Sequence, residues 1–266
     1  MTKQNFISKK LRRIILSTNT SIENYFNLLK TFLHNFKKFK INNNSKVFIA
    51  IGVTVIFIIS YFLIPTTYNK ENIKQNIKNQ ILKKYNIDIK FNNKITYALL
   101  PRPHFTTKKL SILRNDKSIG EVGKFRAFIS IDKLLFFQNF QLNDLVLNKS
   151  DFNIKKGDLV FFKNLLETEA SKNKIIFKDS NIFFQSYDDE VLFINKIKNG
   201  KFFYDSNNLE NIFVADNEVF NIPYKLRIKN NKFNKKIFTK FKWKKIRLNL
   251  KNQIDNGNPV KKSILD

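Results

Sequence analysis

One long uncharged apolar stretch restricts the possible folds of this chain more than any other feature. It runs from Val47 to Ile64, and 13 of its 18 residues are Val, Ile, Leu or Phe. As a helix with a rise of about 1.5 Å per residue it would be about 27 Å long, close to the roughly 30 Å hydrocarbon thickness of a bilayer. A core helix of this length would usually have a polar face. We therefore expect residues 47–64 to be a transmembrane anchor.

The stretch lacks the features of a cleaved signal peptide. Signal peptides place an apolar region of about 7–15 residues near the N-terminus, ahead of a small-residue cleavage site. Here 46 residues precede the stretch, and the sequence from Phe62 to Tyr68 contains no such site. The segment is therefore expected to be retained as an anchor.

The charges around the anchor bear on its orientation. Five lysines lie close to it on each side, so the flanks alone are balanced. The tail, residues 1–46, contains ten basic residues against one acid, which gives it a net charge of +9. Short basic segments tend to stay in the cytoplasm, whereas long domains cross largely regardless of their charge. We expect a cytoplasmic N-terminus and a single-pass topology, with the C-terminal domain on the other side of the membrane.

The tail also carries an amphipathic pattern. Its apolar side chains recur every three or four positions, which predicts a helix. These side chains are Ile22, Tyr25, Phe26, Leu29, Phe32, Leu33, Phe36 and Phe39. Such a basic helix can lie along the inner membrane face with its lysines toward anionic lipids. A helix packed on a partner, or partly disordered in solution, is the alternative.

The region after the anchor changes from a helical pattern to a strand pattern. An apolar stripe predicts an amphipathic helix over about residues 69–85; its members are Ile73, Ile77, Ile81, Leu82 and Tyr85. From Asn86 onward, apolar and polar residues alternate, which indicates strands with one apolar and one solvated face. Two helical interruptions are expected, at residues 132–137 and 159–170. Residues 253–266 are expected to be a disordered tail.

These patterns predict a mainly β fold with an N-terminal transmembrane helix. The domain at residues 65–252 should be an antiparallel, twisted or curved sheet, either a groove or a half-barrel, with short amphipathic helices. Its apolar face can be covered by closure, by a second sheet, or by an apolar occupant such as a lipid acyl chain. The clearest alternation supplies the candidate lipid-facing residues, which are Phe220, Ile222, Tyr224, Leu226 and Ile228. Pro223 within it indicates an edge position or a bulge.

The sequence offers no constellation for catalysis. Its two histidines, His34 and His104, fall on opposite sides of the predicted membrane, so they cannot share a site. There is no cysteine, and the chain has only six glycines and no glycine-rich phosphate loop. We interpret the adjacent acids at 188–190 as a solvated turn. We expect no enzyme activity, no metal and no cofactor.

The net charge of +28 raises the question of an anionic partner. Residues 225–251 contain twelve basic residues and no acid, and within them Phe241 and Trp243 alternate with lysines. This pattern suits single-stranded nucleic acid, an edge strand protected by lysines, or contact with lipid phosphates. Abundant Lys, Asn, Ile and Phe together are also typical of AT-rich codons. The anchor makes nucleic acid the least favoured of these partners.

An ordered series of short motifs follows the anchor. The series comprises ITYALLPRPHF at 95–105, KLSI at 109–112, IGEV at 119–122, Leu134-Leu135, FQL at 140–142, LVL at 145–147, DFNI at 151–154 and KGDL at 156–159. This order, behind a membrane helix and a short amphipathic helix, resembles the N-terminal domain of the AsmA family of bacterial envelope proteins over residues 45–230. The residues that carry the family pattern are Pro101, Pro103, Leu110, Ile112, Leu134 and Leu135.

The resemblance implies a function that the residues alone do not. It implies a bacterial inner-membrane protein with its bulk in the periplasm, similar to groove-forming lipid-transfer proteins and linked to outer-membrane assembly. Phospholipids and other envelope proteins would be its partners. The chain departs from the family in being short and in the lysine content of its last fifty residues. A scaffold without lipid cargo is the alternative, and a basic nucleic-acid-binding membrane protein is a remote one.

Overall fold

The structure is a computed structural model that describes residues 43–114, 117–134, 140–158, 166, 173–231, 236–255 and 263–265. It divides into two compact units, Met1–Ile58 and Ile59–Asp266, which are treated separately. The predicted amphipathic helix of the tail lies outside the described residues. So do Leu135 and most of the two predicted helical interruptions, of which the structure describes η2 (Ile131–Lys133) and Leu166.

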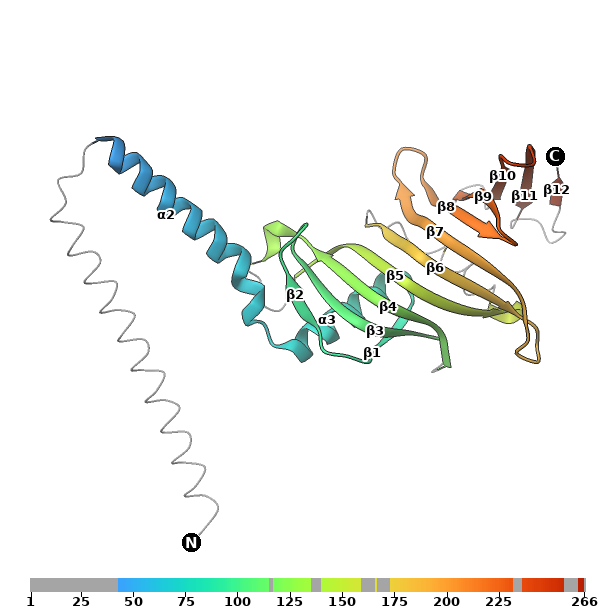
Figure 1. The fold of residues 1–266 in the computed structure, drawn as a ribbon, viewed down its shortest axis with the longest axis horizontal. Helices are drawn as coiled ribbons and strands as arrows, with labels where there is room; N and C mark the ends of the chain where they lie inside the picture. The colour runs from blue at the N-terminus through green and yellow to red at the C-terminus, as the bar shows by residue number, and fades with distance from the viewer. Residues whose placement is uncertain are drawn as a thin grey trace, which may run out of the picture. The chain divides into compact units, whose positions relative to one another are not determined.

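The predicted apolar helix is present as α2 (Asn43–Leu63), labelled in Figure 1. The stretch Lys46–Thr67, which includes the short helix η1 (Ile64–Thr67), is the one helix in the described residues that is long and apolar enough to cross a membrane. Its large side chains are exposed, with Phe48 and Phe57 at 75% and 71%. Most of the apolar side chains of α2 are exposed, and only Tyr61 and Phe62 at its C-terminal end pack against the core. The rest of α2 thus differs from the core helix of a soluble domain.

The second unit contains a 12-stranded sheet, which confirms the predicted mainly β fold. Its strands are β1 (Asp88–Phe91), β2 (Thr96–Ala98), β3 (His104–Arg114), β4 (Lys117–Ile129), β5 (Leu142–Lys155), β6 (Ile175–Gln185), β7 (Val191–Asp205), β8 (Glu210–Val219), β9 (Ile222–Asn231), β10 (Lys236–Trp243), β11 (Leu248–Asp255) and β12 (Ser263–Leu265). The strand order is β1-β3-β4-β5-β6-β7-β8-β9-β10-β11-β12, with β2 also paired to β3. All pairs are antiparallel except β5–β6, which is parallel.

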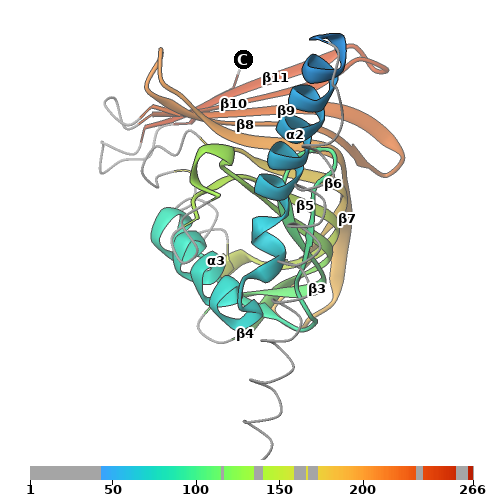
Figure 2. The ribbon, with the colours of Figure 1, turned by 90° about the vertical axis from the view of Figure 1, so that its left-hand side faces the viewer.

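One helix covers part of this sheet. The helix α3 (Lys70–Tyr85) begins at Asn69, whose side chain accepts hydrogen bonds from the amides of Glu71 and Asn72, and it ends at the left-handed Asn86. Four residues of the predicted apolar stripe are buried against the sheet, and Ile77 is completely buried. The fifth, Leu82, was predicted wrongly, because it lies off this face and is 43% exposed. Figure 2 shows the strands curving around the side on which α3 lies. We call this side of the sheet the inner face and the opposite side the outer face.

The inner face depends on a kink that crosses five strands. At Lys109, Gly123, Lys149, Asp179 and Lys198, the regular residue pairing between neighbouring strands is interrupted. Three of these residues, Lys109, Lys149 and Asp179, have a positive φ of 47–54°. Inner-facing side chains are therefore three positions apart across the kink rather than two, as in Leu147 and Ser150 or Phe177 and Ser180. A left-handed residue within a strand bends it, and we call this row the kink line.

Two predictions about the C-terminal half were wrong. Phe220 does not extend the alternation of β9, because it lies in the tight turn between β8 and β9 and is 77% exposed. Both turn residues, Phe220 and Asn221, have positive φ, the conformation of a two-residue hairpin loop. Part of the predicted disordered tail is also ordered, because β11 continues to Asp255 and the short strand β12 pairs with it at residues 252–254.

Candidate functional site

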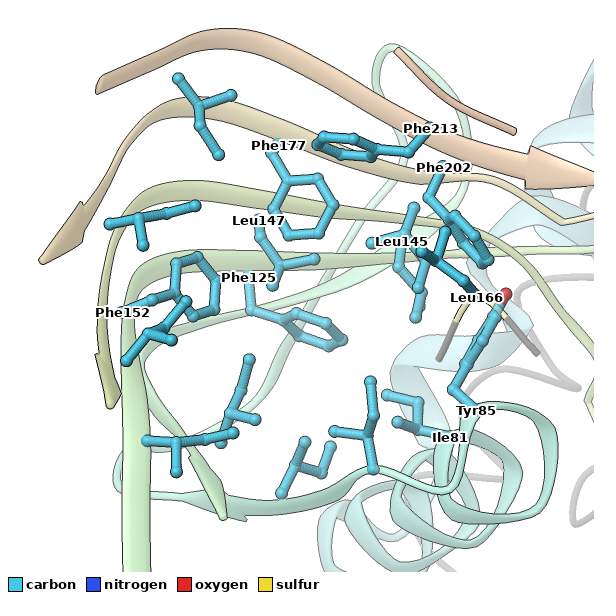
Figure 3. Close-up of a pocket in the computed structure, with 18 of the residues that line it drawn as sticks. Ile81, Tyr85, Phe125, Leu145, Leu147, Phe152, Leu166, Phe177, Phe202 and Phe213 are labelled. Atoms are coloured by element: carbon cyan, nitrogen blue, oxygen red, sulfur yellow. The ribbon is translucent and has the colours of Figure 1, made fainter. Parts of the chain in front are cut away.

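The inner face contains an apolar cavity between α3 and the sheet. Its volume is about 230 Å³, and Figure 3 shows the side chains that surround it. The lining is formed by Ile81, Tyr85, Ile87, Ile89, Leu110, Ile112, Ile119, Phe125, Leu145, Leu147, Phe152, Ile154, Leu166, Ile175, Phe177, Ile182, Phe184, Ile197, Phe202, Phe213, Leu226 and Ile228. Each of these residues is apolar except for the hydroxyl group of Tyr85. The site therefore has the chemistry of a hydrocarbon-binding pocket.

The chemistry of the lining decides what the cavity can hold. A buried water needs about two to four polar partners, whereas a cavity of about 150 Å³ lined by Leu, Ile and Phe stays dry and binds benzene. The present cavity is larger and equally apolar. It can therefore take an apolar segment longer than a benzene ring, but it is too small to enclose a whole phospholipid.

The helix α3 is fixed in place by polar contacts beside its apolar stripe. The side-chain amide of Gln80 donates to the carbonyl of Phe140 (2.6 Å) and its oxygen accepts from the amide of Leu142 (2.9 Å). Lys84 donates to the carbonyl of Leu142 at 3.4 Å, and burial lowers the pKa of this lysine. At the other edge of the helix, Lys78 pairs with Asp88 at 3.0 Å. These contacts hold Ile81 and Tyr85 over the cavity.

Aromatic rings and small residues shape the wall opposite α3. Phe177 makes edge contacts with Phe152 and Phe213, with ring centroids 6.0 and 6.1 Å apart. A Cβ at Gly120 would lie 2.6 Å from the ring of Phe152, and one at Gly200 would lie 3.3 Å from Cβ of Phe177. Two glycines therefore leave the space that these rings occupy.

The predicted lipid-facing residues separate into three groups. Leu226 and Ile228 line the cavity, as the alternation of β9 requires. Ile222 and Tyr224 lie on the same face of β9 but outside the cavity, and Tyr224 instead stacks on Trp243 with ring centroids 5.3 Å apart. Its hydroxyl group donates to Asn195 at 2.9 Å, and burial raises its pKa. Phe220 lies in the turn described above and contributes nothing to the lining.

The apolar face continues beyond the cavity toward the C-terminal strands. Leu226 on β9 lies opposite Phe241 on β10, which lies opposite Leu250 on β11. All three side chains are only half-buried. The inner face of β9–β11 is thus an apolar surface that remains accessible where the cavity ends.

The family-motif residues occupy the N-terminal part of this domain. Leu110 and Ile112 point into the cavity from β3, and Leu134 is fully buried in the core. Leu134 also accepts a hydrogen bond from the hydroxyl group of Tyr68 through its carbonyl. Pro101 follows a cis peptide bond, and Pro103 is buried with its carbonyl accepting from the amide of Ile129 at 3.1 Å. These residues build the scaffold of β2–β4 around the cavity.

Apart from Tyr85, the titratable groups of the described residues do not line the cavity. His104 is buried beside Phe128, with its Nδ1 2.7 Å from the carbonyl of Arg102. Asp188 and Asp189 lie in the exposed β6–β7 turn, and Asp189 pairs with Lys155 at 2.6 Å. Within the described ranges, no group of three or more His, Asp or Glu side chains is arranged to hold a metal ion.

Sequence reasoning missed most of the cavity lining. It singled out β9 alone, although β3–β8, α3 and Leu166 supply most of the side chains. A usable signal existed in the run of aromatic residues on β6–β8, which includes Phe177, Phe202 and Phe213. The kink line hid this signal, because it breaks the simple alternation in five of the contributing strands.

Comparison of the sequence with protein-family models and with curated proteins finds no match. The geometry of the cavity and of the inner face therefore carries the functional argument.

Proposed function

We propose that this protein is an AsmA-like protein anchored in the bacterial inner membrane, and that it shelters or transfers phospholipid along the inner face of its sheet. The supporting observation is the apolar cavity and its half-buried continuation across β9–β11. The helix α2 would hold the domain at the membrane that supplies the lipid. The domain would lie in the periplasm and support outer-membrane assembly.

The mechanism is passive. Acyl chains lie against the apolar inner face while the headgroup stays in water. Sheltering apolar surface contributes about 25 cal/mol per Å², so covering one chain of a few hundred Å² offsets on the order of several kcal/mol. Because the cavity holds only part of a chain, the remaining methylenes lie along Leu226, Phe241 and Leu250. No residue performs covalent chemistry in this scheme.

Site-specific photocrosslinking in the full-length protein tests the proposal. Benzoylphenylalanine replaces Phe213, which lines the cavity, or Tyr187, which is 75% exposed in the β6–β7 turn. We expect a phospholipid adduct at position 213 and a much weaker one at 187, detected by mass spectrometry of the crosslinked chain. This comparison separates cargo from lipids that merely surround the anchor.

A second pair of variants makes the test specific. Leu226→Asp combined with Ile228→Asp places two carboxylates in the apolar lining and should reduce the adduct at position 213 at least tenfold. Leu192→Asp makes the same kind of change at a site on β7 that is 62% exposed, and it should leave the adduct unchanged. An absent adduct, or a protein adduct at position 213, would favour a scaffold without lipid cargo.

A further inference from the structure

The two faces of the C-terminal strands have opposite chemistry. On β10, Phe241 and Trp243 lie on the inner face, so Lys240 and Lys242 lie on the outer face. The same alternation on β9 and β11 brings further exposed cations to the outer face. We call this set the basic face; it consists of Lys225, Arg227, Lys240, Lys242 and Lys251.

The cations of the basic face lie directly opposite one another. Lys240 is paired across the sheet with Arg227 on one side and with Lys251 on the other. Lys242 is paired in the same way with Lys225. Directly opposite side chains have Cβ atoms about 4.5–5.5 Å apart, and like charges at this distance destabilise a sheet. The basic face therefore carries a repulsion that a bound anion would relieve.

The nearby acids do not neutralise this surface. Asp216 pairs with Lys225 at 3.2 Å, and Glu210 pairs with Lys229 at 2.8 Å. In the part of the chain that the structure describes, no acid forms an ion pair with the other four cations of the basic face. These cations thus remain available to a partner.

The outer face is also hollowed where these cations lie. Two shallow depressions of about 650 and 730 Å³ are both bordered by Arg227 and Lys240. Lys251 borders the first, and Lys225 and Lys242 border the second. Acids on the rims of the depressions are Glu210, Asp144 and Asp216, and each is held in an ion pair. Phosphate-sized anions can therefore approach several cations at once.

The turn between β10 and β11 adds an apolar tip to this basic surface. Lys244, Lys245 and Arg247 are exposed around Ile246, which is 55% exposed. Leu248 follows at 40% exposed. Exposed apolar side chains surrounded by cations suit the boundary between headgroups and acyl chains of an anionic membrane.

We infer that the basic face and the β10–β11 turn bind the surface of a bilayer containing anionic phospholipids. Single-stranded nucleic acid is less well matched, because it requires stacking rings and cations on one surface. The stacked rings of Tyr224, Phe241 and Trp243 lie on the inner face, and Phe238 is the aromatic ring of β10 on the outer face. This inference goes beyond the proposed function and does not require a lipid in the cavity.

Vesicle binding by the full-length protein tests the inference. The chain is reconstituted into nanodiscs of phosphatidylcholine, which accommodate α2 and offer no anionic surface. Binding to sedimentable vesicles is then compared between pure phosphatidylcholine and a mixture with phosphatidylglycerol. We expect binding only to the anionic vesicles, with an affinity that falls as salt is added.

Matched variants assign the binding to the basic face. Each Lys or Arg near an anionic surface contributes about 1 kcal/mol, so Arg227→Gln, Lys240→Gln and Lys251→Gln together should weaken binding about a hundredfold. The matched control removes the same charge from exposed sites on α3, on β1 and in the loop after β1, by Lys83→Gln, Lys90→Gln and Lys94→Gln. This control variant should weaken binding less than fivefold. Ile246→Ser should weaken binding several-fold without changing its dependence on phosphatidylglycerol.

Three results would overturn the inference. Equal binding of wild type and the Arg227/Lys240/Lys251 variant would remove the basic face from any role. Displacement by millimolar inorganic phosphate would indicate a site for a single anion rather than a membrane surface. Tight binding of an unstructured oligonucleotide, with weak vesicle binding, would identify nucleic acid as the partner. None of these results depends on the crosslinking outcome at Phe213, so the two proposals fail separately.

Discussion

At the scale of single residues, His104 has an environment that links stability to pH. Its ring is packed on Phe128 and lies within hydrogen-bonding distance of the carbonyl of Arg102. Burial lowers the pKa of His104 below its ordinary value of 6.5, and the neighbouring Arg126, Lys124 and Arg102 act in the same direction, whereas the bond to the Arg102 carbonyl opposes them. The neutral imidazole is therefore the form that the folded protein favours.

This environment predicts a loss of stability in weak acid. Because the folded pKa is below the unfolded one, the unfolded chain binds more protons just below pH 6.5, and stability falls as the pH falls through that window. His104→Phe should remove this component while keeping an aromatic ring against Phe128. Thermal unfolding on either side of pH 6.5 measures it, with His34→Phe as the control. An equal pH response in wild type and His104→Phe would contradict the assignment.

The alternation of β9 holds where the strand is regular and ends with the strand. Leu226 and Ile228 share one face of β9 and line the cavity, and their contact with lipid stays a prediction. The alternation failed for Phe220, because a two-residue turn with positive φ begins there, and Phe gives no signal for that conformation. Asn221 was the available hint, since Asn adopts positive φ more readily than most residues.

At the scale of elements, α3 depends on Gln80 as much as on its apolar stripe. The side chain of Gln80 bonds to the chain on both sides of Gln141, at the carbonyl of Phe140 and the amide of Leu142. Leu142 begins β5, so the side chain of Gln80 joins α3 to one strand of the parallel β5–β6 pair. The position of α3 over the cavity follows from this connection.

Gln80→Leu should therefore loosen α3. It leaves a carbonyl and an amide without their partner, which costs about 1–3 kcal/mol for a buried group and less where water reaches it. We expect a lower unfolding temperature and faster hydrogen exchange of the Leu142 amide. Gln75→Leu, which removes an exposed bond to Asn79 on the same helix, should change neither. Unchanged exchange at Leu142 in Gln80→Leu would refute this role.

Sequence reasoning predicted α3 and the strand-rich region because both have a clear period. It could not predict that Gln80 rather than a neighbouring amide would reach β5, since this depends on how the helix lies on the sheet. Nor could it predict the parallel β5–β6 pair, because strand order depends on contacts between distant segments. The kink line was equally hidden, since lysines at 109 and 149 have no preference for positive φ.

At the scale of the whole molecule, charge and apolarity are distributed along the chain in a way that predicts its topology. Residues 1–46 are strongly basic and short, and α2 follows them as an apolar helix. The positive charge of residues 1–46 predicts that this segment stays in the cytoplasm. The β-rich domain is long enough to cross the membrane despite its own positive charge.

Reporter fusions in a Gram-negative host test this topology. A C-terminal alkaline phosphatase should be active and a C-terminal green fluorescent protein dark, because the first folds only outside the cytoplasm and the second only inside. The same reporters at the N-terminus should give the reverse result. A fluorescent C-terminal fusion would place the basic face in the cytoplasm and would exclude a periplasmic role in lipid movement.

The kink line has a consequence for how this protein tolerates change in its length. In five adjacent strands, the alternation of inner-facing and outer-facing side chains shifts by one residue at the kink line. The register of each strand with its neighbours therefore depends on the position of its own kink. A single residue inserted or deleted within β3–β7 would shift that kink relative to both neighbours and turn one half of the strand over. Insertions should therefore be accepted in the turns but not in the strands. The positions of the kinks thus fix the register of the strands independently of the hydrophobic pattern.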